Sequence, residues 1–112
     1  PFAHQALVRA DARSQEAAQA FLQDVSEAVR QAAYTDPAWA ALLAEVTLYP
    51  PVPLTVQRVA NVERAQLLLE SPSRAALQRF MRAWQPTLHA MRQTPAHKGL
   101  IRWLFDVDPL GI

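Results

Sequence analysis

The spacing of apolar residues changes repeatedly along this chain, between every second residue and every third or fourth residue. Alternating spacing, which is typical of strands, occurs at residues 6–10, 64–70 and 101–107, and a short strand-like run lies at 46–48. Helical spacing extends over residues 17–32 and 77–91. The order strand, helix, strand, strand, helix, strand predicts a split βαβ, or ferredoxin-like, fold.

This order predicts an α+β protein with two layers. We expect a four-stranded, largely antiparallel sheet with both major helices on one face. One side of each strand should then face the core, namely Val8, Ala10, Ala65, Leu67, Leu69, Ile101, Trp103, Phe105 and Val107. The opposite side should form an outer face carrying Leu7, Arg9, Arg64, Gln66, Leu68, Arg102 and Leu104.

Residues that start or stop helices support these boundaries. Capping residues, two of them followed by proline, predict helix starts at Ser14, at Asp36–Pro37 and at Ser71–Pro72. The second of these helices should be short and end at Leu43. Pro86 should kink the last helix, and the prolines at 50, 51 and 53 should form a stiff, extended connection. Residues 54–62 read as a loop.

Composition limits the classes of function. A chain of 112 residues is enough for one domain, spanning residues 1–112, and the absence of an initial Met leads us to expect a fragment of a longer protein. The 11 basic and 10 acidic residues nearly balance, so a basic surface would need local clustering. Without cysteine there is no thiolate chemistry, and two glycines are too few for a phosphate-cradling loop. No apolar run is long enough to span a membrane.

Candidate catalytic and metal-binding groups are sparse. The three histidines show no ligand spacing, so we predict no metal and no cofactor. No histidine stands at a position that would support a serine nucleophile, which makes a small hydrolase the least supported function. Asp106 and Asp108 share the outer face of the last strand, which Pro109 ends. We expect these aspartates to pair with Arg102 and Arg9 rather than to bind metal.

Four segments carry a family resemblance. "LLLESPSRAALQRFMRAW" followed by "IRWLFDVDPLGI" resembles the extreme C-terminal domain of the primosomal replication-restart helicase PriA. "AHQALVRADARSQEAAQAFL" resembles the segment that enters this domain, and "YPPVP" resembles the family's Gly-Pro-Val-Pro connection. The resemblance therefore covers nearly the whole chain.

The resemblance implies a role in restarting stalled replication forks. The family's domain helps to engage branched DNA and binds the C-terminal tail of the single-stranded-DNA-binding protein (SSB), which is acidic and ends in Pro-Phe with a free carboxylate. By resemblance, Arg74 and Gln78 match the residues that bind this tail. The family's ATP-dependent 3′–5′ helicase motor and its cysteine-rich zinc module lie in other segments, so we expect no enzymatic activity here.

Arg74 also stands out without the resemblance. A cation in the first turn opposes the helix dipole, at a cost of about 0.3–1 kcal/mol. Free N–H groups at a helix start attract anions, and a guanidinium added there can bind a carboxylate through two hydrogen bonds. Gln78 lies one turn further along on the same side of the helix. Both residues could instead belong to a solvated helix face.

Other arginines could contact DNA phosphates. Candidate DNA-binding residues are Arg79, Arg82, Arg92 and Lys98 in and after the last helix, with Arg64 and Arg102 on the outer sheet face. A run of charges on a helix is more often simply solvated. The outer face carries leucine and arginine rather than the aromatic rings that stack on RNA bases, which makes RNA recognition unlikely.

Two interpretations therefore remain open. In the first, the chain is a non-catalytic accessory domain of a cytoplasmic, bacterial replication-restart protein that binds forked or single-stranded DNA and the SSB tail. In the second, it is a structural docking module that packs on the helicase lobes of its parent protein and does not bind DNA itself.

Overall fold

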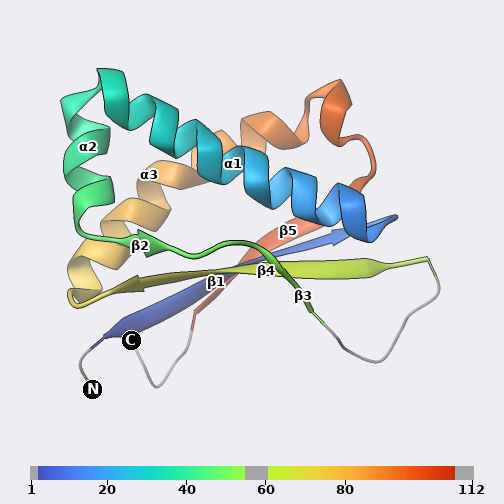
Figure 1. The fold of residues 1–112 in the computed structure, drawn as a ribbon, viewed down its shortest axis with the longest axis horizontal. Coiled ribbons are helices and arrows are strands. Elements are labelled where there is room, and N and C mark those ends of the chain that lie inside the picture. Colours follow the sequence, from blue (N-terminus) through green and yellow to red (C-terminus); the bar gives the residue numbers. More distant parts are fainter. Residues whose placement is uncertain (1–2, 55–60, 108–112) are drawn as a thin grey trace.

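The computed structural model describes residues 3–54 and 61–107. Long strands and helices alternate along the chain, with two very short strands between them (Figure 1). The elements are β1 (His4–Ala12), α1 (Gln15–Thr35), α2 (Pro37–Ala44), β2 (Thr47–Leu48), β3 (Val52–Pro53), β4 (Glu63–Ser71), α3 (Arg74–Arg92), the 3-10 helix η1 (Pro95–His97) and β5 (Leu100–Val107).

The strands form one antiparallel sheet with the order β2-β4-β1-β5, while β3 also pairs with β4. The predicted α+β architecture is confirmed, but the sheet has five strands rather than four. The extra strand is part of the proline-rich connection, where Val52 lies opposite Gln66. An extended segment suits the edge of a sheet, where the missing N–H of a proline costs no ladder bond.

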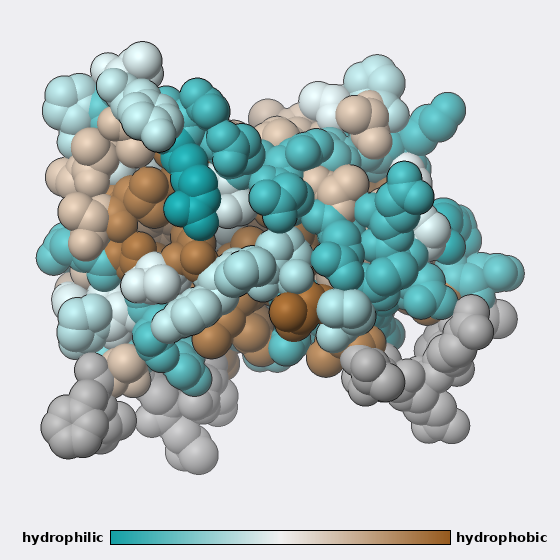
Figure 2. Space-filling view, in the orientation of Figure 1, coloured by the Kyte–Doolittle hydropathy of each residue, from teal (hydrophilic) through white to brown (hydrophobic). Residues whose placement is uncertain are grey.

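All helices lie on one side of the sheet, and the other side is left open (Figure 1). The side chains between the two layers form the core, and the inward residues of β1 and β4 are almost completely buried, as predicted. Trp103 and Phe105 of β5 are partly buried and pack against this core. Figure 2 shows hydrophobic side chains gathered between the helices and the sheet, with hydrophilic residues over much of the helical layer.

Two of the three predicted helix starts are confirmed. Ser14 Oγ accepts a hydrogen bond from the backbone N–H of Ala17 at 3.1 Å, and Asp36 Oδ1 accepts one from Ala38 at 2.9 Å. The prediction that Ser71–Pro72 starts the last helix is wrong. Ser73 caps α3 instead, because Ser71 still belongs to β4, where it lies opposite His4.

Trp84 joins the two long helices. Its indole is completely buried, and Nε1 donates a hydrogen bond of 3.0 Å to the carbonyl oxygen of Val25 in α1. Phe80, one turn earlier in α3, packs against the Trp84 ring. The helix continues past Pro86 to Arg92.

Candidate functional site

The predicted tail-binding residues lie at the start of α3. Arg74 is the first residue of the helix and is exposed, and Gln78 is half-buried one turn later. The cap beside them is Ser73, whose Oγ accepts a hydrogen bond of 3.1 Å from Ala76. Neither Arg74 nor Gln78 has a hydrogen-bond or ion-pair partner among residues 3–54 and 61–107. Within the described residues, the polar groups of Arg74 and Gln78 are therefore free to bind a ligand.

The predicted basic stripe in and after α3 is partly engaged by the protein itself. Arg79 Nη2 lies 3.6 Å from Glu45 Oε2, an ion pair between two half-exposed side chains. Arg92 Nη2 donates a hydrogen bond of 2.7 Å to the carbonyl oxygen of Ile101. Arg82 and Lys98 are exposed. The four residues thus differ in environment, and the role predicted for them in DNA binding remains a prediction.

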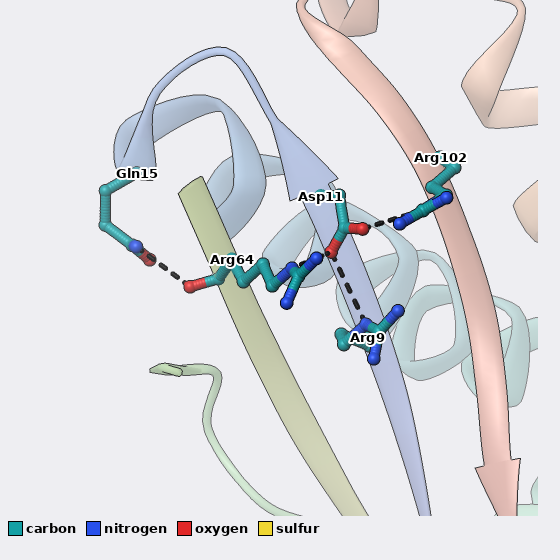
Figure 3. A network of polar contacts seen from close by, with 5 residues as sticks. All are labelled: Arg9, Asp11, Gln15, Arg64 and Arg102. Carbon is teal, nitrogen blue, oxygen red and sulfur yellow. Dashed lines mark hydrogen bonds and ion pairs between the residues drawn. The ribbon is translucent and has the colours of Figure 1, made fainter. Parts of the chain in front are cut away.

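The other two predicted DNA-binding residues, Arg64 and Arg102, meet on the open face of the sheet. Both lie opposite Asp11 of β1, Arg64 on β4 and Arg102 on β5. Arg9 lies two residues before Asp11 and therefore on the same face of β1. The sheet register thus brings together three arginines and one aspartate, which we call the Asp11 cluster: Arg9, Asp11, Arg64 and Arg102 (Figure 3).

Asp11 is the centre of this cluster. Its side chain is only 1 % exposed, although it lies on the open face of the sheet, because the arginine side chains cover it. Nε of Arg102 donates a hydrogen bond of 2.7 Å to Oδ2 of Asp11. Nε of Arg9 and Nε of Arg64 each lie 3.4 Å from Oδ1. Three guanidinium groups against one carboxylate leave a net charge of +2.

The opposite end of the same face is acidic. Glu70 of β4 and Asp106 of β5 lie there, on either side of β1. Glu70 accepts hydrogen bonds of 2.9 Å from Gln5 Nε2 and from the Tyr49 hydroxyl. These two bonds, that from Gln5 first, hold the pKa of the Glu70 carboxyl below its ordinary value. The face is therefore divided into a basic end and an acidic end.

The prediction that Asp106 pairs with Arg102 or Arg9 is wrong. Both arginines face Asp11 instead, and Asp106 lies opposite Leu7. Asp108, the second residue of this prediction, lies outside the described residues. The difference arises because β1 extends two residues beyond its predicted end at Ala10, which places Asp11 inside the sheet.

An apolar groove separates the two charged ends. Its walls come from the middle of the sheet and from the proline-rich connection, and its volume is about 480 Å³. The lining residues are Leu7, Tyr49, Pro50, Val52, Gln66 and Leu68. The outward positions of β1, β4 and β5 in this part of the chain carry no aromatic ring, as predicted. These three strands therefore do not supply the aromatic rings on which RNA-recognition sheets stack bases, and the ring that lines the groove, Tyr49, comes from the segment after β2.

Residues 3–54 and 61–107 contain neither a cluster of metal-ligating side chains nor a membrane-spanning helix. No group of three or more histidine, aspartate or glutamate side chains is arranged there to hold a metal ion. None of the helices in this part is both long enough and apolar enough to cross a membrane.

Comparison with known protein families identifies the family of this chain. Residues 1–110 match the family described as the primosomal protein N C-terminal domain. The chain belongs to this family. The resemblance expected from the four sequence segments is therefore confirmed across almost the whole chain.

A curated relative supports the assignment to the primosomal protein N C-terminal domain family. The replication restart protein PriA from Haemophilus influenzae is 30% identical over 110 residues, which cover 97% of this chain. The aligned region is only 13% of the length of that relative. The similarity thus concerns one small part of the larger protein.

Solved structures share the fold of this family member at low identity. A dimeric ferredoxin-like protein from an uncultured marine organism aligns with a TM-score of 0.51 at 16% identity, covering 95% of this chain and 85% of that one. The de novo designed protein Foldit4 aligns with a TM-score of 0.52 at 9% identity, covering 95% and 98%. These similarities confirm the ferredoxin-like architecture.

Sequence reasoning missed Asp11 as a site residue of this primosomal protein N C-terminal domain. The strand expected from the alternation ends at Ala10, one residue before Asp11. One signal was available: Leu7, Arg9 and Asp11 continue the outward alternation of the strand. Following this alternation by one more step would have placed Asp11 on the outer face of the sheet.

Proposed function

We propose that the chain is a non-catalytic accessory domain of a replication-restart protein and acts in the cytoplasm without a cofactor. The observation that carries this proposal is the family match over residues 1–110. The relative from Haemophilus influenzae is a replication restart protein, and this chain would contribute binding rather than catalysis.

The first binding partner in this proposal is the acidic C-terminal tail of SSB. Arg74 and Gln78 at the start of α3 would bind the tail, with the guanidinium of Arg74 on a carboxylate. The position supports this role, because free backbone N–H groups at a helix start also attract anions. Since the family completes this pocket with residues of the motor domain, we expect weak binding by this chain alone.

Titration with a peptide of the tail sequence tests this part. Loss of a charge-assisted hydrogen bond should weaken binding about tenfold or more in Arg74→Ala. Arg82→Ala removes an equal charge from the same helix and serves as the matched control, with binding expected near that of the wild type. Equal affinities of Arg74→Ala and the wild type would show that Arg74 does not bind the tail.

The second partner is forked or single-stranded DNA, bound through phosphate contacts. Such contacts release counterions, so the affinity should fall steeply with added salt and depend little on base sequence. A salt series with a labelled oligonucleotide measures this. Binding that does not weaken with salt would argue against phosphate contacts.

The open sheet face favours a second candidate function, docking on the helicase lobes of a parent protein. The apolar groove lined by Leu7, Leu68 and Val52 is suited to a protein side chain. In this case the arginines would pair with carboxylates of the other domains. A folded chain that binds no DNA at near-physiological salt would favour docking over DNA binding.

A further inference from the structure

The Asp11 cluster holds more positive charge than its carboxylate needs. A single well-placed guanidinium can pair with one carboxylate through two hydrogen bonds. Here three arginines from three adjacent strands surround Asp11 (Figure 3). Two of them, Arg9 and Arg64, have side chains only 26% and 23% exposed, so they are held against the sheet rather than dispersed in solvent.

The three arginines contact Asp11 through one nitrogen each, and among the described residues their Nη atoms remain free to bind a ligand. All three arginines contact Asp11 through Nε, the guanidinium nitrogen nearest the backbone. Each guanidinium carries further N–H donors on its two Nη atoms. In Figure 3 the Nη atoms of Arg9 point away from Asp11. Asp11 therefore fixes the inner edge of the group and leaves donors at its outer edge.

Hydrogen bonding in the cluster is also incomplete. Nε of Arg9, Nε of Arg64 and Oδ1 of Asp11 are buried and make no hydrogen bond, since the two nitrogens lie 3.4 Å from this oxygen in ion-pair contacts. Buried polar atoms without a hydrogen bond are uncommon in folded proteins and call for an explanation. A bound anion would offset the surplus charge and supply acceptors to the Nη atoms at the outer edge.

We infer that the Asp11 cluster is a phosphate-binding site, in which Arg9, Arg64 and Arg102 bind the backbone of a single DNA strand while Asp11 positions them. This inference rests on the proposed DNA-binding function and assigns it to the open sheet face rather than to α3. Arginine is well matched to phosphate because its planar fork donates two parallel hydrogen bonds. Gln66, in register with Arg9, adds a further donor beside the cluster.

The charges of the face also define where the strand would lie. Glu70 and Asp106 at the acidic end would repel phosphates, whereas Arg64 and Arg102 flank β1 at the basic end. The strand would therefore cross the basic end, over β4, β1 and β5. Contacts of this kind carry no base preference.

A pair of matched variants tests the assignment. Arg9→Gln combined with Arg102→Gln removes two charges but leaves Arg64 beside Asp11, so that the buried carboxylate keeps a cation. Arg79→Gln combined with Arg82→Gln removes two charges from α3. Binding of a labelled oligothymidylate is measured by fluorescence anisotropy over a salt series, and thermal unfolding is followed by circular dichroism.

We expect the sheet-face variant to bind on the order of tenfold more weakly, with a salt slope reduced by about 1.4, which is 0.7 for each of two lost phosphate contacts on a single strand. The α3 variant should stay close to the wild type. A sheet-face variant that binds as tightly as the wild type, or an α3 variant that loses at least as much, would overturn the inference and leave the proposed DNA binding intact. A wild type without DNA binding would overturn both.

A measurement on the unaltered chain does not depend on how the variants fold. Addition of oligothymidylate to ¹⁵N-labelled protein should shift the side-chain Nε–H signals of Arg9, Arg64 and Arg102 more than that of Arg82. A larger shift at Arg82 would overturn the site. The site would also be overturned if an oligoglutamate peptide shifted the signals of the cluster and oligothymidylate did not. The ligand would then be a protein carboxylate rather than a phosphate.

Discussion

Arg102 and Asp11 are 91 residues apart in the chain, yet Nε of Arg102 donates a hydrogen bond of 2.7 Å to Oδ2 of Asp11. The contact spans β5 and β1, which makes it part of the sheet rather than a local turn. Asp11 is almost completely covered, so its negative charge depends on its neighbours for compensation.

Asp11→Ala should lower the free energy of unfolding by about 2 kcal/mol, because three arginines, two of them partly buried, would lose their counter-charge. Urea unfolding followed by circular dichroism measures the change. Asp106→Ala removes an exposed aspartate from β5 and should change stability by less than about 0.5 kcal/mol. Equal stabilities of the two variants would contradict the importance assigned to Asp11.

The predictable parts of the fold are those in which the local spacing of apolar residues matches the residues that are buried in the structure. In β4 the alternation predicts Ala65, Leu67 and Leu69 as core residues, and all three are fully buried. Ser14 is a predictable cap because it immediately precedes the helical pattern. These features depend on neighbours within a few residues, which the sequence displays directly.

The parts that were not predictable depend on pairing between distant segments. Val52–Pro53 is a strand only because β4 supplies its partner, and proline would otherwise argue against a strand. The Asp11 cluster likewise depends on the register of β4 and β5 against β1, which decides which charges meet. Predicting Arg64 and Arg102 as outward residues was possible, but predicting their shared partner was not.

Trp84 links α3 to α1, and its loss should be costly. Trp84→Phe removes the donor to the Val25 carbonyl and leaves a gap in a fully buried site. We expect the free energy of unfolding to fall by about 2–3 kcal/mol, measured by urea denaturation. Trp39→Phe alters a half-buried ring that packs at the edge of the core and should cost less. The reverse order would show that Trp84 does not hold the helices together.

Ser73 is expected to stabilise the start of α3. Ser73→Ala removes the acceptor for the Ala76 N–H and should cost about 1 kcal/mol in thermal or chemical unfolding. Ser73→Asp keeps an acceptor and adds a negative charge beside the helix N-terminus, so its stability should remain near that of the wild type. A destabilised Asp variant with an unaffected Ala variant would argue against capping.

The hydrogen bond between Tyr49 and Glu70 should make stability depend on pH at both ends of the scale. The pKa of Glu70 lies below its ordinary 4.5, because Gln5 and then Tyr49 donate to the carboxylate. This contribution is present above the pKa of the unfolded state and is lost as the pH falls through the lower folded-state pKa. The pKa of Tyr49 is raised above its ordinary 10.0, chiefly by the same hydrogen bond. Its contribution is therefore present below 10.0 and is lost as the pH rises through the higher folded-state pKa.

Tyr49→Phe separates these two effects. The variant removes one of the two donors to Glu70, so the pKa of Glu70 should rise toward 4.5 while the Gln5 contact keeps part of the shift. Titration of the Glu70 carboxyl carbon by NMR measures this pKa directly. Tyr34→Phe, on an exposed tyrosine of α1, should leave it unchanged. A Glu70 pKa that is the same in Tyr49→Phe and the wild type would mean that Tyr49 does not donate to this carboxylate in solution.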